Sequence, residues 1–138
     1  CGTLFPYTTL FRSMYRLCRL HGYNVLALAQ HLDDLAESLL MSMFHGGQLR
    51  TMKAHYRNDA GDVRIIRPLV YCRERQTRDY ATAANLPVVP DSCPACFQMP
   101  TRREHMKALL AREEGEHPHL FANLLQAMRP LLQDESQE

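Results

Sequence analysis

The chain has 138 residues, of which 46% are hydrophobic and 22% charged, as is typical of one globular domain or a piece of a larger one. The formal net charge of +1 is too close to zero to indicate nucleic-acid binding by charge alone, and no apolar run approaches the length of a membrane span. No segment has the pattern of a secretory signal, so we expect neither secretion nor membrane association.

Residues 1–13 do not read as part of a fold. Within them residues 3–13, TLFPYTTLFRS, match the translation of a common short-read sequencing adapter. We therefore expect residues 1–13 to be an artefactual peptide, residues 14–132 to belong to the domain, and residues 133–138 to be a disordered polar tail. Without Arg12 the remainder is formally neutral. A natural apolar N-terminal strand is the alternative interpretation.

The first half of the domain alternates between helical and strand-like patterns. Residues 14–20 predict a helix, and residues 24–29 (NVLALA) form a short apolar run suited to a buried strand. Residues 33–44 predict the clearest helix, because their apolar side chains recur at helical spacing and form one stripe. Gly46 and Gly47 are expected to end it.

The second half continues this alternation. The sequence predicts a turn, a strand, a helix, a short strand flanked by prolines and two further helices, at residues 58–62, 63–66, 74–84, 86–89, 101–112 and 120–128. Strands that alternate with helices predict an α/β fold in which helices flank a parallel sheet.

An acidic cluster lies where the first predicted strand passes into the clearest helix. It contains His31, Asp33, Asp34 and Glu37, and ligands bind at this end of the strands in open parallel sheets. Asp33 and Glu37 are spaced to share one helix face, and carboxylates of this kind suit Mg²⁺. The alternative is structural, since acidic residues in a first helical turn are favoured by capping and by the helix dipole.

The cysteines do not have the spacing of a disulfide framework. Cys93 and Cys96 form a C-x-x-C pair, which in a reducing compartment indicates metal or redox chemistry, and a cytoplasmic location follows. Two thiolates are too few for a closed zinc site or an iron–sulfur cluster, and a coincidental pair is the alternative. Cys18 has the pattern of a buried helix residue.

The segment GGQLRTMKAHYR is basic. Arg50, Lys53 and Arg57 have the charge to contact nucleic-acid phosphates, and Tyr56 has a ring that can stack on a base. A solvated helix and loop surface is the alternative.

Three stretches together resemble one family. LALAQHLDDLAESLLMSMFHGGQLRTM resembles the GHHxDDxxETxxxNxFxGGxLxxM region of the tRNA-cytidine 2-sulfurtransferases, IRPLVYCRE their IRPLxYxRE segment, and LPVVPDSCPACF their FPIIPCxxCG segment. The joint match runs from residue 14 to about residue 132, in the right order and with the right spacing. This family consists of PP-loop ATPases of the adenine nucleotide alpha hydrolase-like superfamily.

The resemblance implies a partial Rossmann-like domain and a reaction. Family members use ATP and Mg²⁺ to adenylate the C2 oxygen of a cytidine in tRNA, and sulfur then replaces that oxygen. A 4Fe-4S cluster held by cysteines carries the sulfur, which comes from a donor such as a cysteine desulfurase. The implied location is the cytoplasm, and a homodimer is left open.

Carried over residue by residue, the resemblance assigns roles to individual side chains. The residues expected near the nucleotide and Mg²⁺ are His31, Asp33, Asp34, Glu37, Gly46, Gly47 and Arg67. Cys93 and Cys96 match the C-terminal cysteine motif, which supplies at least one cluster ligand. Arg50, Lys53 and Arg57 are expected to bind tRNA on the ground of their charge, and not through a family motif.

The chain departs from the family pattern at several points. It lacks the SGGxDS phosphate-binding loop and the central C-x-x-C, Gln30 replaces a histidine, and DSCPACF differs from PCxxCG in spacing. We therefore expect a C-terminal fragment without the N-terminal strands, inactive by itself. The alternatives are another PP-loop tRNA-modifying enzyme, such as a 2-thiouridine enzyme or lysidine synthase, and a non-enzymatic metal- or RNA-binding module.

Overall fold

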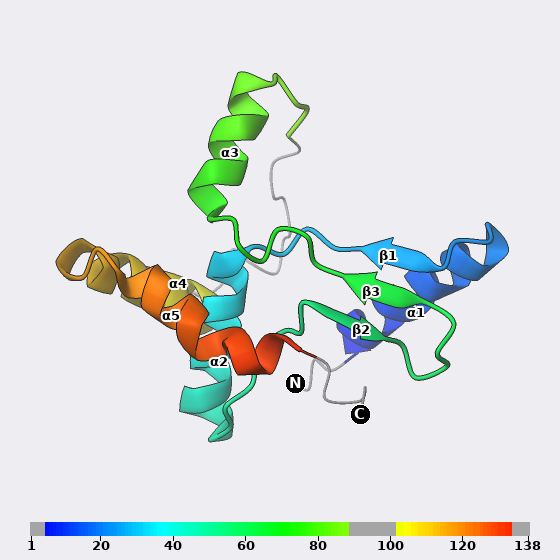
Figure 1. Ribbon diagram of the computed structural model, residues 1–138, viewed down its shortest axis with the longest axis horizontal. Coiled ribbons are helices and arrows are strands. Elements are labelled where there is room, and N and C mark those ends of the chain that lie inside the picture. Colours follow the sequence, from blue (N-terminus) through cyan, green and yellow to red (C-terminus); the bar gives the residue numbers. More distant parts are fainter. Residues whose placement is uncertain (1–4, 89–101, 134–138) are drawn as a thin grey trace.

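The computed structural model describes residues 5–88 and 102–133, with side chains from residue 11 onward. Figure 1 shows a small sheet with helix α1 on one side of the molecule and a group of packed helices on the other. The elements in chain order are α1 (Phe5–Leu20), β1 (Val25–Ala27), α2 (Leu32–Gly46), β2 (His55–Arg57), β3 (Arg64–Ile66), α3 (Glu74–Ala83), α4 (Arg102–Glu116), α5 (Leu120–Met128) and the 3₁₀ helix η2 (Arg129–Leu132).

The sheet has the strand order β1-β3-β2. β1 and β3 are parallel, with Leu26 opposite Ile65, as the α/β prediction requires. β2 pairs with β3 in the antiparallel direction, so the prediction of a purely parallel sheet is wrong and the sheet is mixed. The predicted turn at residues 58–62 makes this possible, because a tight turn can join antiparallel strands whereas parallel strands need a crossover.

β2 escaped prediction because it is short and polar. Its three residues, His55, Tyr56 and Arg57, show no apolar alternation. The turn that follows is closed by Asn58, whose Oδ1 accepts the Val63 N–H at 3.1 Å and whose own backbone N–H donates to the Val63 carbonyl at 3.0 Å. Local hydrogen bonding of the turn, and not hydrophobic pattern, therefore sets this pairing.

Helix α2 is the centre of the core. Its predicted apolar stripe is confirmed for Leu32, Leu35, Ala36 and Leu39, which are all at most 4% exposed, but not for Met43, which is 42% exposed. The stripe packs against α4 and α5, which cross α2 side by side in Figure 1. The other buried members of this cluster come from the second half of the chain and are Val70, Leu110, Phe121, Met128 and Leu132. The core therefore joins α2 to the C-terminal helices more than to the sheet.

Helix α1 begins at Phe5 and not at Met14, so it continues through most of the segment that the sequence analysis set aside. The alternative of an N-terminal strand is wrong for residues 5–13, which are helical. Cys18 is 6% exposed, which confirms the prediction of a buried helix residue. The adapter origin of residues 3–13 stays a prediction.

Helix α3 stands away from the other elements in Figure 1 and contains no buried residue. The predicted strand at residues 86–89 is wrong as far as residue 88, because residues 86–88 form no strand and Val88 is 72% exposed. Pro87 offers no N–H to a neighbouring strand. Val89 and residues 134–138 lie outside the described residues. No helix in the described part of the chain is long and apolar enough to cross a membrane.

The C-terminus of α2 provides a matched test of the fold. Gly47 has φ 59°, in the left-handed region; its N–H donates to the Met43 carbonyl, and the Gln48 N–H donates to the Ser42 carbonyl. Gly47→Ala should lower the free energy of unfolding by about 1 kcal/mol, since alanine is strained at this φ. Gly46→Ala, one residue earlier and inside the helix, should raise it by about 0.5 kcal/mol.

Neither substitution meets a steric obstacle, because nothing lies within 4 Å of a Cβ built at either glycine. Urea denaturation followed by circular dichroism measures both changes. Equal effects of the two substitutions would contradict the predicted backbone role of Gly47.

Candidate functional site

The acidic cluster of His31, Asp33, Asp34 and Glu37 spans the N-cap and first two turns of α2 and is called the acidic turn below. His31 and Asp34 cap this helix together. His31 is the N-cap, and its backbone N–H donates to Asp34 Oδ2 at 3.0 Å. The Asp34 N–H donates in return to His31 Nδ1 at 3.3 Å. This reciprocal capping box satisfies backbone donors that the helix itself cannot satisfy.

Asp33 links this turn to the start of α3. Its two carboxylate oxygens accept hydrogen bonds from Arg73 Nε and Nη2 at 3.0–3.2 Å, and Oδ2 also accepts the Glu74 N–H at 2.7 Å. Arg73 is the N-cap residue of α3. One carboxylate on α2 therefore fixes both the side chain and the backbone where α3 begins.

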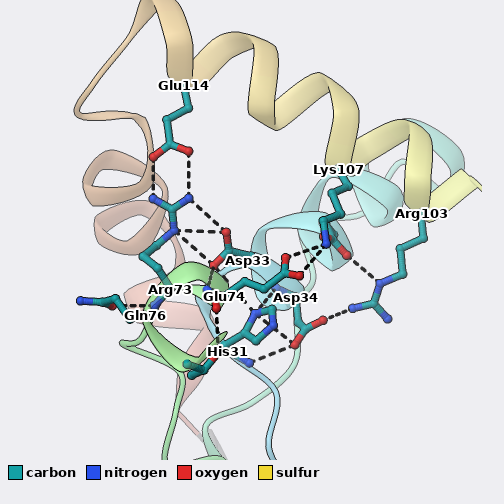
Figure 2. A network of polar contacts seen from close by, with 11 residues as sticks. His31, Asp33, Asp34, Arg73, Glu74, Gln76, Arg103, Lys107 and Glu114 are labelled. Carbon is teal, nitrogen blue, oxygen red and sulfur yellow. Dashed lines mark hydrogen bonds and ion pairs between the residues drawn. The ribbon is translucent and has the colours of Figure 1, made fainter. Parts of the chain in front are cut away.

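An adjacent edge of the Arg73 guanidinium, which shares Nη2 with the first, binds the last part of α4. Nη1 and Nη2 donate to the two carboxylate oxygens of Glu114 at 2.6 and 2.9 Å. The guanidinium carbon also lies 3.3 Å from the ring centroid of Phe121, in the first turn of α5. Figure 2 shows Arg73 between Asp33 and Glu114, and its side chain is only 13% exposed.

These contacts shift the ionisation of all three groups. Burial raises the pKa of Asp33, but the hydrogen bonds from Arg73 and from the Glu74 amide outweigh it, so the pKa of Asp33 lies below its ordinary value. Hydrogen bonding to Arg73 likewise lowers the pKa of Glu114. The hydrogen bond to Glu114 raises the pKa of Arg73, so the three groups are ionised together at neutral pH.

Helix α4 brings two further cations to the same place. Arg103 Nε donates to Glu37 Oε2 at 2.6 Å, and Arg103 Nη2 donates to Asp34 Oδ1. Lys107 Nζ lies 2.6 Å from Glu74 Oε2. The Glu37 side chain is 5% exposed and that of Arg103 is 44% exposed, so the pair connects a buried carboxylate to the surface.

A cavity of about 90 Å³ lies among these helices. Its wall is mainly charged, with apolar side chains from α4 and α5, and consists of Asp33, Glu37, Arg73, Glu74, Lys107, Leu110, Ala111, Glu114 and Phe121.

Comparison with known proteins identifies the family. Residues 9–113 match the model of the PP-loop domain. The chain belongs to the PP-loop domain family. This confirms the family resemblance seen in the sequence, and the α/β class with a partial Rossmann-like sheet is confirmed with it.

The curated relatives agree with this assignment. The chain is 41% identical over 115 residues to a tRNA-cytidine(32) 2-sulfurtransferase of Geobacter metallireducens, covering 83% of the chain and 45% of that relative. A protein of the same name from Pelobacter propionicus is 39% identical over 116 residues, covering 84% of the chain and 43% of the relative. The chain thus spans less than half the length of these relatives.

A solved structure shows the same fold. It is a U34-tRNA thiolase, NcsA, from Methanococcus maripaludis with its 4Fe-4S cluster, and it superimposes with a TM-score of 0.73 at 20% sequence identity. The match covers 100% of this chain and 46% of the thiolase chain.

Gly46, Gly47 and Arg67, which the sequence also predicts near the nucleotide, are not part of the acidic turn of this PP-loop chain. Gly46 and Gly47 lie at the opposite end of α2, about 20 Å along its axis from Asp33 by the rise of an α-helix. Arg67 is 6% exposed and donates to Gln30 Oε1 at 3.0 Å and to the Lys53 carbonyl at 2.6 Å. Gln30, which replaces a family histidine, therefore binds Arg67.

The predicted tRNA-binding residues are separated in the same way. Arg50 and Lys53 line one cavity of about 300 Å³ with Leu49, Thr51, Pro130, Leu131 and Gln133. Arg57 lies on β2, where its Nη1 donates to the Gly61 carbonyl at 3.0 Å. Two of the three basic residues thus share a concave surface.

The described residues do not fit the Mg²⁺ site that the sequence predicts. Asp33, Asp34 and Glu37 each accept a hydrogen bond from an arginine side chain. No three His, Cys, Asp or Glu side chains in the described part of the chain are placed to hold a metal ion. Cys93 and Cys96 lie outside the described residues. Cys18 and Cys72 are free thiols, buried and half-buried.

Sequence reasoning missed the partners of the acidic turn. Arg73, Arg103, Lys107 and Glu114 were not predicted as site residues, although Arg73 and Glu74 close the IRPLVYCRE segment of the family match. That segment was the available signal. Nothing in the sequence indicated Glu114 or Phe121.

The lowered carboxyl pKa values predict a pH dependence of stability. On unfolding, Asp33 and Glu114 return to ordinary pKa values of 3.8 and 4.5. Because their folded pKa values are lower, the unfolded chain binds more protons in this range. The stability that these groups contribute is complete above the range and is lost as the pH falls through it.

Urea denaturation from about pH 6 to pH 3 should therefore show a falling free energy of unfolding in the wild-type chain. Arg73→Met removes the partner that lowers both pKa values, so its curve should be shallower. Equal slopes for the two proteins would contradict the assigned ion pairs.

Proposed function

We propose that this chain is part of a tRNA-thiolating enzyme that forms 2-thiocytidine. The observation that carries the proposal is the identity of 41% over 115 residues to a tRNA-cytidine(32) 2-sulfurtransferase. The PP-loop family assignment supports an ATP-dependent reaction, and the fold shared with a U34-tRNA thiolase is consistent with it.

The chemistry of the whole protein follows the family scheme. ATP with Mg²⁺ would activate the cytidine C2 oxygen as a leaving group, and a 4Fe-4S cluster would supply the sulfur, recharged by a donor such as a cysteine desulfurase. The proposed location of the enzyme is the cytoplasm, and assembly into a homodimer is left open.

This chain would contribute three parts to that enzyme. The start of α2, with His31, Asp33, Asp34 and Glu37, would lie near the nucleotide, as the family motif implies. Cys93 and Cys96 would supply at least one cluster ligand. Arg50 and Lys53, which line the cavity beside η2, would contact tRNA phosphates through their positive charge, and Arg57 would add to the basic surface on β2.

Complementation tests the proposed base. The complete gene, recovered from its source locus, is expressed in a bacterial strain that lacks 2-thiocytidine in its tRNA. Mass spectrometry of the tRNA nucleosides should show 2-thiocytidine restored. The double variant Cys93→Ser/Cys96→Ser of the same gene should restore none, because a serine hydroxyl does not replace a thiolate as a cluster ligand.

Other modified nucleosides in this experiment would indicate a different function. Formation of 2-thiouridine or lysidine in place of 2-thiocytidine would assign the chain to another PP-loop tRNA-modifying enzyme. Stable Zn²⁺ binding by this chain, with no new nucleoside from the complete gene, would favour a non-enzymatic module.

The 138-residue chain itself should be inactive. It contains no SGGxDS loop to donate backbone N–H groups to ATP phosphates, and it lacks the central C-x-x-C. Purified without oxygen and supplied with ATP, Mg²⁺, sulfide and tRNA, it should neither hydrolyse ATP nor thiolate tRNA. Turnover above the background of a mock purification would contradict this prediction.

A further inference from the structure

The three carboxylates in the first two turns of α2, Asp33, Asp34 and Glu37, are the residues from which sequence motifs predict a metal site, yet all three bind arginine. Asp33 binds Arg73, and both Asp34 and Glu37 bind Arg103. These contacts come from two different helices that are distant in sequence from α2. The pairing is therefore a property of the tertiary fold. It gives the carboxylates arginine side chains as ligands in place of a metal ion.

We propose that the acidic turn of α2 is an intramolecular docking site for arginine side chains and not a divalent-cation site. Arg73 and Arg103 occupy it and thereby fix α4 and α5 against α2. This inference goes beyond the proposed function and holds for whichever tRNA base the parent protein modifies.

The geometry around Asp33 suits a guanidinium. Arg73 presents two N–H groups along one edge to the Asp33 carboxylate and further N–H groups to Glu114, and its flat face covers the Phe121 ring at 3.3 Å. A planar, delocalised cation uses all of these neighbours at once. Mg²⁺ would instead need an octahedral set of oxygens at about 2.1 Å, which an aromatic face does not offer.

Electrostatics favours the same interpretation. A divalent ion bound to Asp33 would lie within a few ångströms of the Arg73 charge, and Asp33 Oδ2 is also committed to the Glu74 N–H at 2.7 Å. If such an ion displaced Arg73 from Asp33, the guanidinium charge would remain in a site where the Arg73 side chain is only 13% exposed. The buried cation would then keep Glu114 and the Phe121 ring but lose one of its two carboxylate partners.

The contacts of Arg103 and Glu114 explain how the docking orients α4. Arg103 lies in the first turn of α4 and Glu114 near its end, so α4 is tied to the acidic turn at both ends, directly through Arg103 and indirectly through Arg73. Figure 2 shows the two arginines approaching the turn from opposite sides. Phe121 extends the contact to α5. The turn thus fixes the direction of the helices whose apolar faces form the core.

Substitution tests the docking directly. Arg73→Met should raise the unfolding equilibrium constant of the 138-residue chain on the order of a hundredfold, because it leaves Asp33 and Glu114 without their shared partner. Arg78→Met is the matched control from the same helix. Its side chain is 68% exposed and its ion-pair distance to Asp79 is 3.8 Å, so the constant should change less than about twofold.

A double-mutant cycle with Asp33→Asn isolates the pair. Each single substitution raises the unfolding equilibrium constant by some factor. The double variant Asp33→Asn/Arg73→Met should raise it by a factor at least about tenfold smaller than the product of the two single factors, because the same contact can be lost only once. Independent effects of the two substitutions would overturn the proposal. Arg73→Lys, which keeps the charge but not the planar fork, should fall between the wild type and Arg73→Met.

A magnesium titration of the wild-type chain covers the case in which the variants do not fold. Thermal unfolding is measured in MgCl₂ and in NaCl of equal ionic strength, and isothermal calorimetry is run with MgCl₂ alone. Docking predicts equal melting temperatures in the two salts and no heat of binding. A melting temperature of the wild-type chain raised specifically by Mg²⁺, or a heat of Mg²⁺ binding, would overturn the proposal and restore the metal site.

These outcomes are independent of the tRNA product. Loss of 2-thiocytidine formation by the complete gene would refute the proposed function and leave the docking measurements unaffected. Mg²⁺-specific stabilisation would refute the docking and leave the proposed function unaffected.

Discussion

The guanidinium of Arg73, held between Asp33 and Glu114, is the contact on which the arrangement of the helices depends. The sheet is too small to position them, because each strand has three residues. Apolar burial drives α2, α4 and α5 together but is not directional. A planar group with carboxylates on two edges and an aromatic ring on its face allows only one arrangement of those partners. The ion pair therefore specifies how the helices pack, and the apolar cluster supplies most of the stability.

This arrangement is stable only because every charge in it has a partner. Taking ionised groups out of water is costly, and a buried ion pair offsets that cost only with good geometry and additional hydrogen bonds. Asp33 receives a backbone N–H as well as the guanidinium, and Arg73 has two carboxylates and a ring. No buried side-chain nitrogen or oxygen in the described part of the chain lacks a hydrogen-bond partner. The network thus has the completeness that a buried polar cluster requires.

The sequence predicted features that depend on neighbours along the chain. The buried part of the α2 stripe, the end of α2 at Gly47 and the helix at residues 120–128 follow from periodicity and from glycine conformation, and these are confirmed. The antiparallel strand β2 was missed because three polar residues carry no periodic signal. The partners of the acidic turn were missed for a different reason. Arg73 lies 40 residues from Asp33 and Arg103 lies 66 from Glu37, and no local pattern encodes contacts at that separation.

The same limit explains why the acidic motif identifies the family but not its own ligand. Carboxylates in the first turn of a helix can accept N–H groups or coordinate a metal, since both use the same oxygen lone pairs. Which ligand they take depends on the charges that other segments bring to them. In this chain α3 and α4 bring Arg73 and Arg103, whose hydrogen bonds engage Asp33, Asp34 and Glu37. A motif shared with the family therefore supports family membership, while the role of each carboxylate follows from the helices packed around it.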